Sequence, residues 1–194
     1  AGLVSAYIAA AVKAKVALIE KHKMGGDCLN TGCVPSKALI RSAKAADTLR
    51  HANRYGLESV PVKGSFKNIM NRVKDVIAKV EPHDSPERYR KLGVDCIAGE
   101  ASFVSPWELE VRHNDGRTER LTARSIVVAT GGKPAVPPIP GLKDMEPLTS
   151  DNLWELQEQP ERLLVLGGGP IGSELALAFA RLGSKVTQVE MGER

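Results

Sequence analysis

A chain of 194 residues with 42% hydrophobic and 26% charged residues has the composition of an ordinary globular protein of one or two domains. The net charge of +4 comes from scattered Lys and Arg with only 4% aromatic residues, which argues against a nucleic-acid-binding surface. No apolar run is long enough to span a membrane and no secretory signal pattern is visible, so the three cysteines fit a reducing, cytoplasmic compartment.

Hydrophobic periodicity and turn residues predict alternating helices and strands, which is typical of an α/β fold. Helices are expected over residues 3–13, 33–50, 173–182 and, with interruptions near Pro82 and Pro86, over 68–92. Strands are expected over residues 16–20, 95–98, 103–104, 108–112, 118–122, 124–129, 163–166 and 185–190. A turn at residues 114–116 makes a hairpin, and a proline-rich linker follows over residues 134–140.

The two ends of the chain resemble one another. A shift of 170 residues aligns Gly2 with Gly172 and Glu20 with Glu190. In the second copy an apolar strand leads into G-x-G-x-x-G over residues 167–172, then a helix with Gly183 as its C-cap, then a strand ending in Glu190. This order predicts a complete βαβ unit that binds a dinucleotide; the alternative is a glycine-rich turn that binds nothing.

The residue types of the second copy suit a bound pyrophosphate. Gly167 allows a tight turn, Gly169 lets the backbone approach the phosphates, and Gly172 lets helix and strand pack closely. Glu190 stands where a carboxylate accepts hydrogen bonds from a ribose 2′-hydroxyl, and its charge favours NAD(H) over NADP.

The first copy lacks the opening strand and the first two glycines. Gly2 then corresponds to the third glycine and Glu20 to the ribose-binding acid. Lys13 stands at the counterpart of Gly183, so this helix is expected to end without glycine. We interpret both ends of the sequence as cuts through a larger protein.

The segment over residues 24–37 contains Cys28 and Cys33. Five residues of regular helix rise about 7.5 Å, beyond the usual Cα limit of about 6.8 Å for a disulfide. A disulfide here therefore requires an irregular turn, which residues 30–32 (Asn-Thr-Gly) can form. Pro35 predicts a helix starting near Cys33, where the helix dipole and Lys37 favour a thiolate. Zinc binding is disfavoured because no second pair of Cys or His lies nearby to complete four ligands. The remaining alternative to a redox pair is that both cysteines are small buried side chains at a turn.

Three motifs, in this order, resemble the class I pyridine nucleotide–disulfide oxidoreductases, a family that includes dihydrolipoyl dehydrogenase, glutathione reductase and mercuric reductase. They are Gly25-Gly26-Asp27-Cys28 through Lys37, the Ser-Ile-Val-Val-Ala-Thr-Gly run over residues 125–131, and the glycine motif at Gly167. Two departures stand out. Asp27 occupies a position where the family more often has Thr, and none of the four histidines matches the family's His-Glu pair.

The resemblance implies a Rossmann-like FAD-binding domain with a parallel sheet and a small β-meander over residues 1–148. The start of a second Rossmann-like NAD(P)-binding domain is then expected over residues 149–194. Cys28 matches the interchange thiol, Cys33 the charge-transfer thiol, and Lys37 a residue near flavin N5. The FAD contacts are expected at Gly2, Glu20, Gly25, Gly26, Asp27, Cys28, Lys37, Ala101, Thr130, Gly131 and Gly132. The NAD(H) contacts are expected at Gly167, Gly169, Pro170, Ile171, Gly172, Glu174 and Glu190.

The implied activity is electron transfer between NAD(H) and a small-molecule or protein-bound disulfide or dithiol, through FAD and Cys28–Cys33. Dihydrolipoamide fits the NAD preference best, and mercuric ion is the alternative substrate. A non-catalytic flavin-binding module and a flavin-only oxidase or NADH dehydrogenase are the other hypotheses. The full protein is expected to be a homodimer without a bound metal, and this stretch alone is expected to be inactive.

Overall fold

The computed structural model describes residues 1–192, which form two compact units. Unit 1 comprises Ala1–Asn30 and Lys79–Lys133, and unit 2 comprises Thr31–Ala78 and, among the described residues, 134–192. Arg194, a cation close in sequence to the predicted nicotinamide site, lies outside the described residues. Within residues 1–192, no helix combines the length and the apolar character needed to cross a membrane.

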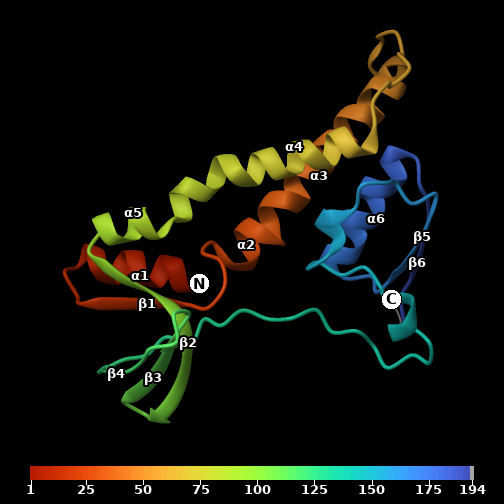
Figure 1. Ribbon diagram of the computed structural model, residues 1–194. Helices are drawn as coiled ribbons and strands as arrows, with labels where there is room; N and C mark the ends of the chain where they lie inside the picture. The colour runs from red at the N-terminus through yellow and green to blue at the C-terminus, as the bar shows by residue number, and fades with distance from the viewer. Residues whose placement is uncertain (193–194) are drawn as a thin grey trace. The chain divides into compact units, whose positions relative to one another are not determined.

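Unit 1 is built on a four-stranded sheet of order β1-β2-β3-β4. β1 and β2 are parallel, whereas β2, β3 and β4 pair in antiparallel fashion, which confirms the predicted parallel pairing and small meander (Figure 1). The elements of this unit are α1 (Gly2–Ala11), β1 (Val16–Glu20), α2 (Gly26–Asn30), η2 (Glu81–Asp84), α5 (Pro86–Lys91), β2 (Val94–Ser105), β3 (Glu108–His113) and β4 (Thr118–Thr122).

The strand β2 corrects one expectation from the sequence. Residues 95–98 and 103–104 were predicted as two short strands, yet Val94–Ser105 forms one continuous strand. Its first half pairs with β1, as far as Ala98, and its second half pairs with β3, starting where Gly99 faces His113. The strand is continuous because β1 and then β3 supply its hydrogen bonds. The alternation of polar and apolar residues in a short stretch of sequence does not reveal such a change of partner strand.

The core of unit 1 lies between α1, α5 and the parallel strands. Its buried residues are Ala6, Ala10, Tyr89 and Val94. Small alanines on α1 allow that helix to pack closely on β1. The helix ends without glycine, as expected, because Lys13 itself adopts a left-handed φ of 66°.

The predicted core strand over residues 124–129 is wrong. Residues 125–130 have no regular secondary structure, and Val127 and Val128 are 65% and 66% exposed. A strand needs a hydrogen-bonded neighbour, and within residues 1–192 the sheet of unit 1 contains only β1 to β4. The apolar, β-branched composition of this segment suits a sheet, but composition does not determine whether a neighbouring strand is available for it to pair with.

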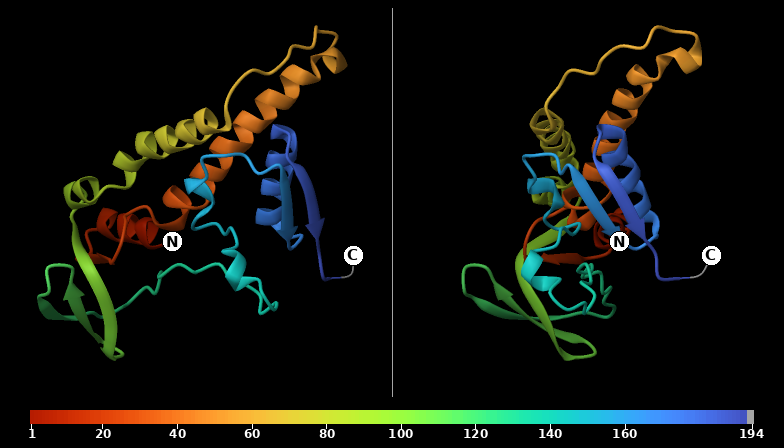
Figure 2. Two further views of the ribbon diagram at one scale, coloured as in Figure 1. Left: turned by 45° about the vertical axis from the view of Figure 1, so that its right-hand side comes forward. Right: turned by 90° about the vertical axis from the view of Figure 1, so that its right-hand side faces the viewer.

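Unit 2 contains the predicted βαβ unit. β5 and β6 are parallel, with Arg162 facing Lys185 and Leu166 facing Val189, and α6 connects them. Both views of Figure 2 show α6 lying along this pair of strands. The elements are α3 (Cys33–Arg50), η1 (Ala52–Tyr55), all but the last two residues of α4 (Phe66–Val80), η3 (Lys143–Met145), η4 (Leu153–Glu155), β5 (Arg162–Leu166), α6 (Pro170–Leu182) and β6 (Lys185–Val189).

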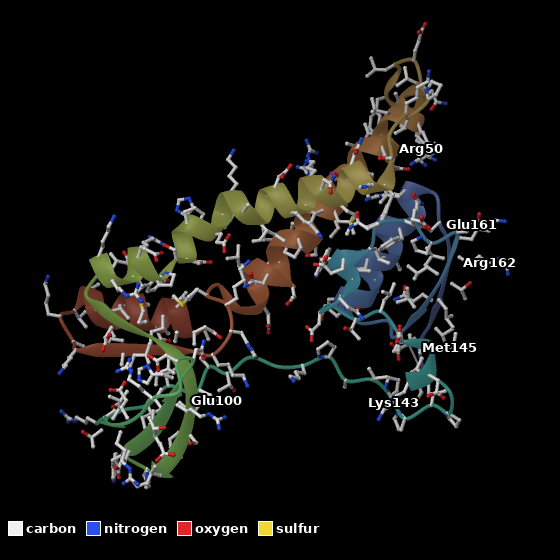
Figure 3. All side chains as sticks on the ribbon, in the orientation of Figure 1. Arg50, Glu100, Lys143, Met145, Glu161 and Arg162 are labelled. Atoms are coloured by element: carbon white, nitrogen blue, oxygen red, sulfur yellow. The ribbon has the colours of Figure 1, made fainter. Side chains whose placement is uncertain are left out.

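One hydrophobic core joins α3, α4, η4 and α6. Leu39, Met70 and Phe179 are completely buried in it, and the rings of Phe66 and Phe179 lie 5.9 Å apart. Arg50, labelled in Figure 3, ends α3, and its guanidinium donates a hydrogen bond to the backbone carbonyl of Arg181 on α6. The helix that begins at Cys33 and the helix of the glycine motif are therefore packed against each other within one unit.

Candidate redox and dinucleotide site

A break in the helix separates the two cysteines of interest. α2 ends at Asn30 and α3 begins at Cys33, so no regular helix runs through both cysteines, as the spacing predicted. The Asn30 side-chain amide donates to the carbonyls of Met24 (3.0 Å) and Gly26 (2.9 Å). These bonds hold the end of α2 against the segment that precedes it. Cys28, in unit 1, and Cys33, in unit 2, are both exposed.

Glycine at position 25, three residues before Cys28, is required by local geometry. Gly25 has a φ of 96°, and a Cβ placed there would lie 2.3 Å from Cδ2 of Leu29. Leu29 is itself only 1% exposed, so its side chain has no room to move away. The backbone of this segment can therefore pass close to α2 only with glycine at position 25.

Several of the predicted FAD contacts border one segment of unit 1. A Cβ built at Gly2 would lie 3.3 Å from the Cβ of Ala129, and one built at Gly131 would lie 3.3 Å from Oδ2 of Asp27. Residues 129–131 thus lie beside the start of α1 and beside Asp27, the residue that departs from the family pattern. Glu20 ends β1 and accepts a hydrogen bond from the His22 backbone (2.9 Å). Ala101 lies exposed on β2, and Gly132 follows Gly131.

The glycine motif forms the loop between β5 and α6. Gly167, with a φ of 107°, donates its N–H to the carbonyl of Val189 (2.8 Å), which closes the loop against β6. Pro170 opens α6, and Ile171 is 67% exposed at its first turn. A Cβ built at Gly169 meets no atom within 4 Å, so the backbone here is open to a ligand that approaches closely. The loop therefore fits a pyrophosphate placed at the N-terminus of α6.

Gln188, which the sequence reasoning missed, and Ser173, which lies within the predicted range 167–174, hold the carbonyls of this loop. The Gln188 amide donates to the Gly167 carbonyl (2.8 Å) and to the Ser173 hydroxyl (3.2 Å), and Ser173 donates to the Gly168 carbonyl (3.2 Å). A polar amide between the β-branched Thr187 and Val189 was the signal that could have identified Gln188. These bonds turn the loop carbonyls toward protein donors and away from the anion site.

Glu190, the predicted ribose-binding acid, contacts the glycine loop directly. Its carboxylate accepts hydrogen bonds from the backbone N–H groups of Gly168, Met191 (2.7 Å) and Gly192 (2.9 Å). Hydrogen bonds from Gly192, then Gly168 and Met191, lower the pKa of Glu190 below its ordinary value of 4.5. A ribose hydroxyl would therefore bind to a carboxylate that is already oriented at the end of β6.

These hydrogen bonds predict a pH dependence of stability. A carboxyl whose pKa is lowered by folding stabilises the protein above its unfolded pKa, and that stabilisation is lost as the pH falls through the folded pKa. We expect Glu190→Gln to lower the free energy of unfolding at about pH 7, and the difference from wild type to shrink below pH 4.5. Urea unfolding across this range measures it, with the exposed Glu158→Gln as control; a difference that stays constant down to acid pH contradicts the assignment.

An ion pair links the redox helix to the nucleotide-binding helix. Lys37 of α3 donates to Oε2 of Glu174 on α6, and the two side chains are 60% and 47% exposed. An exposed pair of this kind adds little to stability, so its effect is mainly to orient the two side chains. The structure thereby brings together the lysine predicted beside the flavin and a glutamate predicted beside the nicotinamide.

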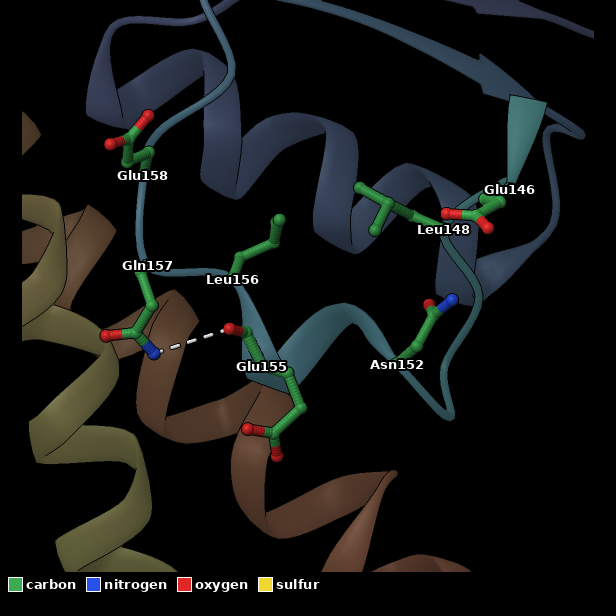
Figure 4. Close-up of a pocket in the computed structure, with 7 residues that line it drawn as sticks. All are labelled: Glu146, Leu148, Asn152, Glu155, Leu156, Gln157 and Glu158. Carbon is green, nitrogen blue, oxygen red and sulfur yellow. Dashed lines mark hydrogen bonds between the residues drawn. The ribbon is translucent and has the colours of Figure 1, made fainter.

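A pocket of about 510 Å³ lies elsewhere in unit 2 (Figure 4). It contains none of the predicted site residues; its lining is Glu146, Leu148, Asn152, Glu155, Leu156, Gln157 and Glu158. Within the described part of the chain, no group of three or more His, Cys, Asp or Glu side chains is arranged to hold a metal ion. The predicted site residues therefore lie outside this pocket, on the cysteine turn and on the glycine loop.

Comparison with known proteins agrees with the geometry. The chain is 38% identical over 189 residues to a mercuric reductase from Streptomyces lividans, covering 96% of this chain and 40% of the relative. It is 36% identical over 195 residues to a dihydrolipoyl dehydrogenase from Acholeplasma laidlawii, covering 98% and 56%. The flavoprotein disulfide reductase RclA from Escherichia coli, solved as a Cu(II) complex, superimposes with a TM-score of 0.80 at 30% identity, covering 100% of this chain and 40% of that one.

The chain thus spans about half or less of the length of these proteins. A family model described as pyridine nucleotide-disulphide oxidoreductase matches residues 1–194, which confirms the resemblance inferred from the three motifs. The chain belongs to the pyridine nucleotide-disulphide oxidoreductase family.

Proposed function

We propose that the full protein passes electrons between NAD(H) and a disulfide or dithiol substrate, using FAD and the Cys28–Cys33 pair. The observation that carries the proposal is the packing of α3 on α6, with Lys37 paired to Glu174. This contact joins the helix that begins at a candidate redox cysteine to the helix that begins at a dinucleotide loop. A purely nucleotide-binding protein has no need for a cysteine at this helix terminus.

In this proposal each part of the chain has a separate task. Residues 1–148 would hold FAD, with Glu20 on the adenosine ribose and the segment from Gly25 to Cys28, Ala101 and residues 130–132 along the cofactor. Residues 149–194 begin the NAD(H)-binding domain, in which Gly167 to Glu174 and Glu190 contact the nucleotide. Bound FAD would supply the two-electron chemistry that amino-acid side chains lack.

The cysteines and Lys37 would act in sequence. Cys33 begins α3, so its sulfur lies where the helix dipole stabilises negative charge, and Lys37 adds a cation one turn further on. Cys28 would exchange with the substrate disulfide through a mixed disulfide, and Cys33 would then displace the substrate thiol and close the Cys28–Cys33 bond. The reverse order oxidises a dithiol substrate.

The similar proteins include both mercuric reductases and dihydrolipoyl dehydrogenases. The choice between these substrates therefore rests on the residues of the site. Glu190 would repel the 2′-phosphate of NADP, which favours NAD(H) and, with it, dihydrolipoamide. Mercuric ion is the second candidate, favoured by the similarity to mercuric reductases. We further propose that the full protein is a homodimer. We also propose that it is cytoplasmic, in keeping with cysteines that serve exchange rather than a disulfide framework.

The test is the absorbance spectrum of the full-length protein after anaerobic reduction with one equivalent of NADH. We expect a long-wavelength band from charge transfer between a thiolate and the flavin, because a reduced cysteine pair would leave Cys33 against oxidised flavin. Bleaching of the flavin without that band would contradict the proposal and would favour a flavin-only oxidase or NADH dehydrogenase. Absence of bound flavin in the full-length protein would contradict every flavoprotein hypothesis.

A further inference from the structure

Trp154 connects the linker before the nucleotide motif to the turn between the two cysteines. It lies in η4, is 5% exposed, and packs in the core of unit 2 with α3, α4 and α6. Its indole Nε1–H is shared between two backbone carbonyls, those of Thr31 (3.0 Å) and Ser150 (2.8 Å). Thr31 belongs to the two-residue break between α2 and α3, two residues before Cys33.

The segment that carries Trp154 is itself held in place. The Asn152 side chain accepts a hydrogen bond from the Thr149 backbone (2.7 Å), which closes the turn before η4. On the other side, Glu155 pairs with Lys74 of α4 (2.8 Å). The indole is thus buried on a segment that makes contacts on both sides, and its N–H donates to a carbonyl in the two-residue break between α2 and α3.

We infer that Trp154 is a positioning residue for the redox turn, and this inference rests on the proposed function. Cysteines five apart can form a disulfide only while the backbone between them keeps one irregular conformation. Loss of the indole donor frees the Thr31 carbonyl and lets the turn sample other conformations, so one thiol meets the other less often. At a given ratio of reduced to oxidised dithiothreitol, a larger fraction of the protein is then in the dithiol form.

The experiment measures the thiol–disulfide equilibrium of the full-length, FAD-loaded protein against dithiothreitol. Each exchange forms one Cys28–Cys33 bond and reduces one oxidised dithiothreitol, so two electrons and two protons move together. Alkylation followed by mass spectrometry counts the two forms. We expect Trp154→Phe to shift the equilibrium about fivefold toward the dithiol, which corresponds to one hydrogen bond of ~1 kcal/mol. The chain's other tryptophan gives the control, since Trp107 is 64% exposed near the β2–β3 turn and Trp107→Phe should leave the equilibrium unchanged.

A second substitution separates the hydrogen bond from the volume of the ring. In the Trp107→Phe background position 154 holds the only tryptophan of this stretch, and β-(3-benzothienyl)alanine placed there keeps the bicyclic ring but replaces N–H by sulfur. We expect the same fivefold shift. An unchanged equilibrium in this variant, or in a folded Trp154→Phe protein, overturns the inference. A wild-type protein that forms no Cys28–Cys33 bond at any poise contradicts the proposed function instead.

Discussion

Replacing Cys28 with serine is expected to abolish substrate turnover in the full-length protein, by at least about 10³-fold, while FAD stays bound. A serine hydroxyl cannot form the mixed disulfide on which the exchange depends, whereas every other residue expected around the cofactor is unchanged. Cys33→Ser should also block turnover and in addition remove the long-wavelength charge-transfer band. Steady-state assays with NAD(H) and dihydrolipoamide, together with flavin absorbance, measure both effects.

The third cysteine provides the matched control. Cys96 is half-buried on β2, and burial raises the pKa of its thiol, so that it remains protonated and unreactive near neutral pH. Cys96→Ser should therefore keep both turnover and the charge-transfer band. Wild-type disulfide reductase activity in Cys28→Ser would refute the exchange mechanism and leave a reaction carried out by the flavin alone.

Alanine substitutions at two glycines of the nucleotide loop are expected to have different effects. A Cβ at Gly172 would lie 2.6 Å from the carbonyl oxygen of Gly167 and 3.4 Å from Cγ1 of Val165, so the loop must move. We expect Gly172→Ala to destabilise the fold by about 2 kcal/mol, the usual cost of overpacking, and to weaken NADH binding as well. Urea unfolding measures the first effect and NADH titration the second.

Gly169→Ala should act on the ligand alone. Gly169 has a φ of −68° and a ψ of 173°, which an L-residue adopts without strain, and a Cβ there meets no protein atom within 4 Å. Stability should therefore stay at the wild-type value, whereas the affinity for NADH should fall about tenfold because the methyl group occupies the path of the pyrophosphate. If Gly169→Ala binds NADH as tightly as the wild type, the phosphates do not approach this backbone.

The sequence by itself determined the parts of the site that depend on a few neighbouring residues. The βαβ unit followed from periodicity and from the glycine spacing at Gly167, Gly169 and Gly172, and the start of α3 at Cys33 followed from Pro35 and the preceding Asn-Thr-Gly. The end of α1 at a residue other than glycine was also predictable, because comparison of the two copies placed Lys13 there. Each of these features is encoded within about one turn or one strand, where local conformational preference decides the outcome.

Only the tertiary structure decided which distant groups meet. The pairs Lys37–Glu174 and Trp154–Thr31 join residues 137 and 123 positions apart, and no local pattern relates them. The same reason explains the errors at residues 124–129 and in β2, because a strand exists only where a neighbouring strand supplies hydrogen bonds. Composition and spacing thus determined the chemical groups and their local geometry, whereas packing of the helices determined which of those groups hold one another in place.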